Sequence, residues 1–83
     1  MYTLKDIKPG MRLVLRNGSQ RVVLGNGTLV VDPACGAKYA GRALYLDEYC
    51  SKLRHPLPGY DIMAVWDPNV GPLWQRTENT KEH

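Results

Sequence analysis

The sequence has no long hydrophobic run, since its longest apolar stretches, such as residues 22–24 and 29–31, are only a few residues long. A membrane-spanning helix needs about 20 consecutive apolar residues, so we expect no membrane association. Lys5 and Asp6 place charge where a secretion signal would have its apolar segment. Export is therefore not expected, and the cytoplasm of a cell is the predicted location.

Cysteine is also scarce, with only Cys35 and Cys50 in the chain. Two cysteines are too few for a disulfide scaffold, and in a reducing compartment they stay thiols. Together with His55 and His83 they show no recognised metal-ligand spacing. We expect no metal and no cofactor. Cys50 lies among apolar neighbours and is expected to be buried. A catalytic Cys35 would need His55 as its base, and loop packing is the preferred interpretation.

Signatures of enzymatic chemistry are missing too. The chain has eight glycines, but none forms a dinucleotide-binding or Walker loop. Asp47 and Glu48 are interpreted as a helix cap and its first turn, not as an acid–base pair. Asp61 lies in an apolar segment, so we expect it to accept hydrogen bonds from a neighbouring loop or to pair with an arginine. The chain is predicted not to be an enzyme.

Turn residues are plentiful, and they separate short segments with β patterning. Asn17-Gly18 and Asn26-Gly27 predict two type I′ hairpin turns. Within the first segment Met11, Leu13 and Leu15 alternate with Arg12, Val14 and Arg16, which is typical of a half-buried strand. The predicted strands cover residues 11–16, 20–24, 28–32, 42–46, 60–66 and 73–76.

Two short helical turns are predicted beside these strands. Thr3 followed by Asp6 matches a capping box, and Asp47 is expected to cap a second turn. In the strand at 60–66, Ile62, Ala64 and Trp66 alternate with Met63 and Val65, which indicates a central strand covered on both faces. Residues 33–41 predict a long loop.

The fold class that follows is mainly β, a small antiparallel SH3-like barrel with one or two short helical turns. An OB-like barrel is the alternative. Residues 1–76 are expected to form a single domain, followed by a frayed tail at 77–83.

The C-terminal half carries two longer patterns, Y-D-I-M-x-V-W at residues 60–66 and L-W-x-R at residues 73–76. With residues 44–49 before them, they resemble small bacteriophage- and prophage-encoded proteins. The resemblance implies a phage origin, a bacterial host cell and a compact barrel. It brings no catalytic residue to this chain.

Eleven lysines and arginines against eight acidic residues give a net charge of +3, which permits an acidic partner without requiring one. Basic and aromatic residue types suited to binding gather on the first hairpin, the long loop and the last strand. The candidate binding residues are Arg12, Arg16, Arg21, Lys38, Tyr39, Arg42 and Trp74. If the three hairpin arginines are solvated, their replacement by Ala changes stability by no more than about 0.5 kcal/mol.

Three functions are compatible with these residues. The first is a phage accessory protein that engages or inhibits a host protein, in host takeover or anti-defence, with strand edges that offer a route to a homodimer. The alternative is a nucleic-acid-binding barrel that uses the basic hairpin. A second alternative is sequestration of a small anionic nucleotide by Lys38, Tyr39 and Arg42. Tyr60 and Trp66 are expected in the core, whereas for Tyr39 and Trp74 a position in the core and a position in an interface are about equally probable.

Overall fold

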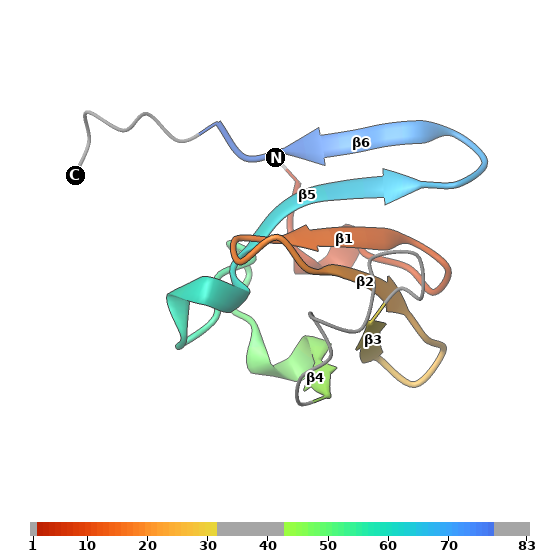
Figure 1. The fold of residues 1–83 in the computed structure, drawn as a ribbon. Coiled ribbons are helices and arrows are strands. Elements are labelled where there is room, and N and C mark those ends of the chain that lie inside the picture. Colours follow the sequence, from red (N-terminus) through yellow and green to blue (C-terminus); the bar gives the residue numbers. More distant parts are fainter. Residues whose placement is uncertain (1, 32–42, 78–83) are drawn as a thin grey trace.

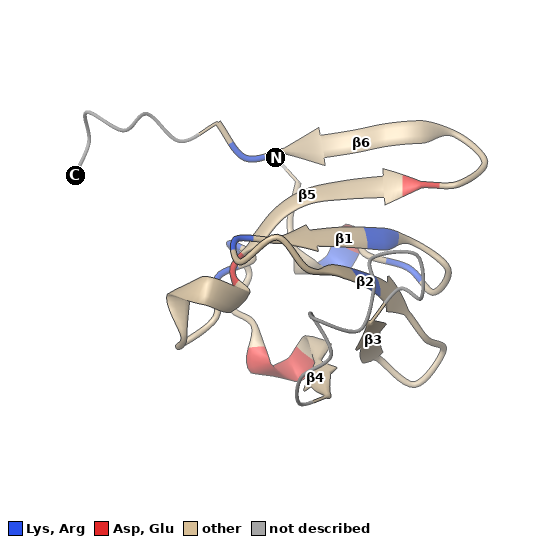
Figure 2. Cartoon of the chain, in the orientation of Figure 1, with Lys and Arg blue, Asp and Glu red and all other residues tan. Residues whose placement is uncertain are grey.

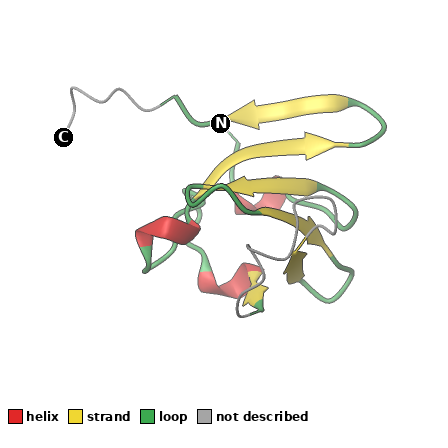
Figure 3. Ribbon diagram, viewed as in Figure 1, coloured by secondary structure: helices red, strands yellow, loops and turns green. Residues whose placement is uncertain are grey.

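The computed structural model describes residues 2–31 and 43–77 of the chain (Figure 1). In these residues the strands form one antiparallel sheet in the order β4-β3-β2-β1-β5-β6. The elements are η1 Leu4–Asp6, β1 Arg12–Leu15, β2 Gln20–Val23, β3 Thr28–Val31, β4 Leu44–Tyr45, η4 Leu46–Glu48, η5 Pro58–Tyr60, β5 Ile62–Asp67 and β6 Gly71–Gln75, where η marks a 3₁₀ turn. The prediction of a small, mainly β, antiparallel fold with short helical turns is confirmed (Figure 3).

The sheet bends so that β3 and β4 turn back beneath β1 and β2 (Figure 1). Leu13 and Leu15 of β1 are fully buried on the inner face, while Arg12 and Val14 point to the outer face, as the alternation predicts. The buried apolar side chains form one cluster: Ile7, Leu13, Leu15, Val23, Leu29, Leu44, Tyr49, Leu53, Ile62 and Val65. Among the described residues, this core lies on the inner face of the sheet.

Both predicted hairpins are present, but the type I′ turns are not. The first loop contains three residues, because Leu15 and Ser19 pair through a 2.9 Å hydrogen bond and the Gly18 N–H donates to the Leu15 carbonyl. Gly18 has φ +90°, whereas Asn17 does not have a positive φ. The Asn17 side-chain oxygen instead accepts the Ser19 N–H at 2.9 Å. Such a loop needs a left-handed residue at its third position only.

The strand β5 differs from its prediction in a similar way. Against β1, Leu15 pairs with Ile62 and Val14 pairs with Ala64, so Met63 is an extra residue in a β-bulge. Simple alternation would place Ile62 and Ala64 on one face. The bulge separates them, so that Ile62 faces the core and Ala64 faces outward. The strand is paired on both sides, to β1 and β6, but its outer face is not covered as predicted.

The helical turns are short, and two of them, η1 and η4, are capped by a carboxylate. In η1 the Thr3 N–H donates to the Asp6 carboxylate at 2.8 Å, which confirms the predicted capping box. In η4 the cap is Tyr45, whose N–H donates to Glu48 at 2.9 Å, so Asp47 is not the cap. The Glu48 side chain performs this role because its carboxylate reaches back to the start of the turn. The predicted loop at 33–41 and the tail beyond Thr77 lie outside the described residues.

Candidate binding face

The outer face of the sheet carries two rows of neighbouring side chains, fixed by strand register. In the first row Arg12 lies opposite Val22 on one side and Trp66 on the other, and Trp66 lies opposite Pro72. In the second row Val14 lies between Gln20 and Ala64, and Ala64 lies opposite Gln75. Directly opposed residues in an antiparallel sheet have Cβ atoms about 5 Å apart, so each row is a continuous surface.

These rows border a groove of about 500 Å³. Its lining combines small apolar side chains, Val14 and Ala64, with Trp66, Arg12 and the proline of β6. Pockets that bind small molecules have volumes of about 300–1,000 Å³, so the groove is large enough to hold part of a ligand or partner.

Trp66 is the main correction at this site, since the sequence predicted it in the core. Its side chain is 41% exposed. The bulge at Met63 is the reason: after the extra residue, Val65 takes the inward position beside Leu13, and Trp66 turns outward beside Arg12. The alternation in the sequence gives no signal of this bulge.

The three hairpin arginines that were predicted to share a basic face lie in different surroundings. Arg12 lines the groove. Arg16 pairs with Asp61 beyond the end of β1. Arg21 is only 2% exposed, and its Nη1 donates to the Leu29 carbonyl at 3.1 Å. The prediction of a solvated Arg21 is wrong, because the three-residue loop places Arg21 opposite Leu13 on the inner face.

Trp74, also predicted at the site, lines the groove and is half-buried against the core. Its ring stacks on Tyr2 with centroids 5.9 Å apart, and the Arg76 guanidinium lies 5.1 Å from its centroid. Trp74 therefore has a packing role as well as a place beside the groove. Lys38, Tyr39 and Arg42 lie outside the described residues.

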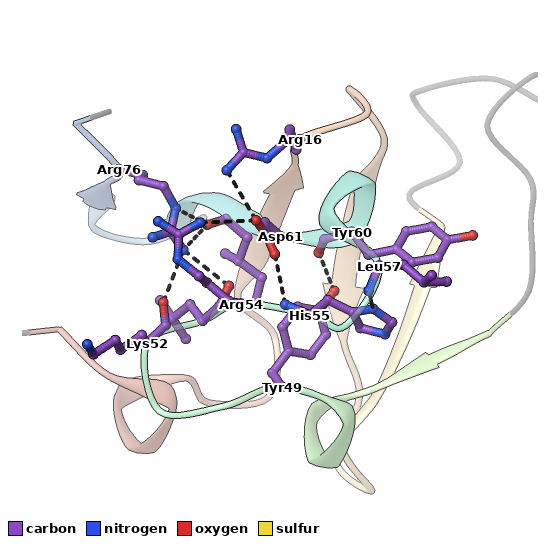
Figure 4. A network of polar contacts seen from close by, with 11 residues as sticks. Arg16, Tyr49, Lys52, Arg54, His55, Leu57, Tyr60, Asp61 and Arg76 are labelled. Atoms are coloured by element: carbon purple, nitrogen blue, oxygen red, sulfur yellow. Dashed lines mark hydrogen bonds and ion pairs between the residues drawn. The ribbon is translucent and has the colours of Figure 1, made fainter. Parts of the chain in front are cut away.

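Asp61 is the centre of a polar cluster, as Figure 4 shows. Its Oδ2 accepts from Arg16 at 3.1 Å and from Arg54 at 3.3 Å, and its Oδ1 accepts the His55 N–H at 2.8 Å. Asp61 is 3% exposed, so these donors replace the water that it loses. The prediction that Asp61 pairs with an arginine and a loop is confirmed. We call Asp61, Arg16 and Arg54 the Asp61 cluster.

Arg76 holds a strained turn beside this cluster. Leu53 is fully buried with φ 65°, a left-handed conformation that costs a leucine roughly 1–2 kcal/mol. The Arg76 side chain donates to the carbonyls of Lys52, Leu53 and Ile62 at 3.0 to 3.2 Å. These contacts fix the turn that carries Arg54 to Asp61.

His55, the base in the catalytic alternative, is built into the fold. Its Nδ1 accepts the Leu57 N–H at 2.9 Å, so its Nε2 carries the proton and donates to Glu48 at 3.1 Å. The ring also lies edge-on to Tyr49 and Tyr60. Cys35, its suggested partner, lies outside the described residues. These contacts position the loop before η5 and give His55 a structural role.

Cys50 does not occupy the buried site that the sequence predicted. It is exposed, because it follows η4 in a turn whose inward position is taken by Leu53. Backbone hydrogen bonds at Arg54 and at Lys52 lower the pKa of the Cys50 thiol from its ordinary value. Its thiolate therefore forms at lower pH than that of an unperturbed cysteine.

Within residues 2–31 and 43–77, no group of three or more His, Cys, Asp or Glu side chains is arranged to hold a metal ion. Over the same residues, none of the helical segments has the length and apolar character needed to cross a membrane. Comparison of the chain with protein-family models, with curated proteins and with solved structures gave no match. The groove and the Asp61 cluster are thus the candidate functional features of the described residues.

Proposed function

We propose that this chain is a non-enzymatic binding protein that engages another protein through the groove on the outer face of β1, β5 and β6. The observation that carries the proposal is the exposed Trp66 beside Arg12 over a small apolar floor. Tryptophan and arginine are the residue types most enriched at the energetic centres of protein interfaces. An exposed tryptophan surrounded by Val14, Ala64 and Pro72 is suited to bury a partner's apolar side chain.

The biological setting that we propose is a phage accessory protein acting on a host protein in the bacterial cytoplasm. Its support is the resemblance of residues 60–66 and 73–76 to phage- and prophage-encoded proteins. Small proteins of this origin often interfere with host or defence machinery, which is an argument by analogy.

Nucleic-acid binding by the first hairpin has less support from the structure than it had from the sequence alone. That alternative needed Arg12, Arg16 and Arg21 on one face, and Arg21 lies in the interior while Arg16 pairs with Asp61. Sequestration of a small nucleotide relies on Lys38, Tyr39 and Arg42, which lie outside the described residues. It stays a prediction.

The test is capture of bacterial lysate proteins on the immobilised chain, with and without nuclease. We expect a specific protein to be retained after nuclease treatment, and retention to fall by about tenfold or more in Trp66→Ala. Val70→Ala is the matched control, because Val70 is 74% exposed but does not line the groove. Circular dichroism checks that each variant is folded. Capture that needs nucleic acid, or that survives Trp66→Ala unchanged, contradicts the proposal.

A further inference from the structure

Loops 16–18, 25–27 and 51–53 share one backbone pattern. In each loop the residue before it donates its N–H to the carbonyl of the residue after it, and the third loop residue donates its N–H back to the residue before the loop. The residues paired across the three loops are Leu15 with Ser19, Leu24 with Thr28, and Cys50 with Arg54. A three-residue loop of this kind needs a left-handed residue at its third position.

The loop at residues 51–53 has a residue that is poorly suited to this position. The third residues of the other two loops are Gly18 and Gly27, with φ +90° and +85°, whereas here Leu53 has φ 65°. The left-handed conformation is unfavourable for leucine, because its Cβ comes too close to a carbonyl oxygen. The Leu53 side chain is fully buried in the core. The closed loop therefore depends on contacts with other parts of the chain.

The C-terminal end of β6 supplies the largest group of these contacts. Arg76 lies directly after β6, where the chain is blue in Figure 2. Its Nη2 donates to the carbonyls of Lys52 and Leu53, at 3.1 Å each, as Figure 4 shows. The Leu4 N–H adds one bond, to the Ser51 carbonyl at 3.3 Å. Because a guanidinium is charged, its hydrogen bonds are stronger than those of neutral donors.

The same arginine joins the loop to the start of β5. Arg76 donates from Nε and Nη2 to the Ile62 carbonyl, at 3.2 and 3.0 Å. The Ile62 N–H in turn donates to the Leu53 carbonyl at 3.1 Å. Within the described residues β6 is an edge strand that pairs with β5 alone. Segments with few neighbours open at lower cost than the centre of a sheet.

We infer that the loop at residues 51–53 is a conformational switch that Arg76 holds closed. When the Arg76 side chain is released, Leu53 leaves the left-handed conformation and the loop opens, while the rest of the sheet stays folded. The inference is independent of the proposed function, because neither Arg76 nor this loop lines the groove.

Cys50, directly before the loop, reports which state the loop is in. Its side chain is exposed. Backbone hydrogen bonds at Arg54 and at Lys52 lower the pKa of the Cys50 thiol. These bonds belong to the closed loop, so opening raises the pKa toward its ordinary value. The pH midpoint of Cys50 alkylation, measured in a Cys35→Ser background, therefore moves to higher pH when the open state is populated.

The experiment measures amide hydrogen exchange by NMR in the full chain. The probes are the amides of Cys50 and Ile62, and the references are the amides of Leu15 and Leu24, which bond across the other two loops. In Arg76→Gln we expect the two probes to exchange about tenfold faster, a factor equivalent to the cost of one left-handed leucine. The two references should be unchanged, and the midpoint of Cys50 alkylation should rise.

A double-mutant cycle connects Arg76 to the strain at Leu53. Leu53→Gly removes the unfavourable backbone conformation, so in this background Arg76→Gln should accelerate exchange at Ile62 by about threefold or less. Lys52→Gln is the matched control for hydrogen exchange. It removes a positive charge from the same loop and keeps the carbonyl that accepts from Arg76.

Equal acceleration of probes and references in Arg76→Gln would mean that Arg76 stabilises the whole fold, and this result overturns the inference. Unchanged exchange at Cys50 and Ile62, or an undiminished effect of Arg76→Gln in the Leu53→Gly background, overturns it as well.

The wild-type chain provides the test if Arg76→Gln does not fold. Local opening exposes little surface, so exchange at Cys50 and Ile62 should depend only weakly on low concentrations of urea. A urea dependence as steep as that of global unfolding contradicts the switch.

Discussion

At the scale of single residues, several charged side chains in the described part of the chain hold turns in place. Asp61 joins the end of β1 to the segment before η5, since it contacts Arg16, Arg54 and the His55 N–H. Removing the Asp61 carboxylate leaves the buried His55 N–H without its acceptor, whereas the side chains of Arg16 and Arg54, 32% and 49% exposed, remain in contact with water.

Asp61→Ala is therefore expected to lower the free energy of unfolding by about 1–3 kcal/mol. Asp47→Asn, at an exposed position that is not a cap, should change it by no more than about 0.5 kcal/mol. Urea denaturation of both variants measures the difference. Similar midpoints for the two variants would show that the Asp61 cluster contributes little to stability.

Arg21 and Arg12 are both arginines, but Arg21 lies on the inner face of the sheet and Arg12 on the outer face. We expect Arg21→Ala to destabilise the protein by about 2 kcal/mol or more, because it leaves a cavity beside Leu13 and removes the donor to Leu29. Arg12→Ala, on the outer face, should stay within about 0.5 kcal/mol. Thermal unfolding of the two variants distinguishes them, and an unchanged stability of Arg21→Ala argues against the buried position.

Cys50 provides a test that depends on pH. Because backbone hydrogen bonds lower the pKa of its thiol in the folded state, the alkylation rate should rise with pH at lower values in native protein than in urea-unfolded protein. The same shift makes the contribution of Cys50 to stability largest above the unfolded pKa, and this contribution is lost as pH falls through the folded pKa. A Cys35→Ser background isolates Cys50, and coincident native and unfolded profiles contradict the expectation.

At the scale of elements, single extra residues decide which way side chains face. The loop at residues 16–18 contains three residues, so Arg21 pairs with Leu13, whereas a two-residue turn at Asn17-Gly18 would place Arg21 opposite Val14. The bulge at Met63 does the same for Trp66. A shift of one residue moves every later side chain of a strand to the other face.

The second hairpin loop tests this account of the turns. Gly27 has φ +85°, so Gly27→Ala is expected to cost about 1–2 kcal/mol. Gly25 lies in the same loop without a positive φ and with open space at its Cβ position, so Gly25→Ala should be neutral or stabilising by about 0.4–1 kcal/mol. Chemical denaturation measures both, and an equal loss in the two variants would mean that the left-handed conformation is not the cause.

At the scale of the whole molecule, the sheet has two ends within the described residues, β4 and β6. The strand β4 has only two residues, and β6 contains Pro72 and a register shift beside it. Short edge strands, prolines and bulges are features that prevent strands of different molecules from pairing.

The prediction of a homodimer through strand edges thus gains no support from these edges, and we expect a monomer. Sedimentation velocity should give a single species of 9.4 kDa, and Pro72→Thr, which restores a backbone donor to β6, should increase self-association. A wild-type dimer whose population does not respond to Pro72→Thr would contradict this expectation.

Much of the fold was accessible from the sequence because its signals are local. The capping box at Thr3, the hairpins at Asn17 and Asn26, and the inward Leu13 and Leu15 depend on neighbours a few residues away. The pairing of Asp61 was predictable in kind, since a buried carboxylate needs donors, although Arg54 and Arg76 were not singled out.

The sequence by itself determined that the chain forms short antiparallel strands joined by turns, because alternation and turn residues act over a few positions. Only the tertiary structure decided that Trp66 faces solvent, that Arg21 lies in the interior and that Arg54 joins Arg16 at Asp61. The face of the sheet on which a side chain lies depends on the register of its strand with the partner strand. One extra residue in a loop or bulge reverses that face, and the packing of the whole core determines whether the extra residue is present.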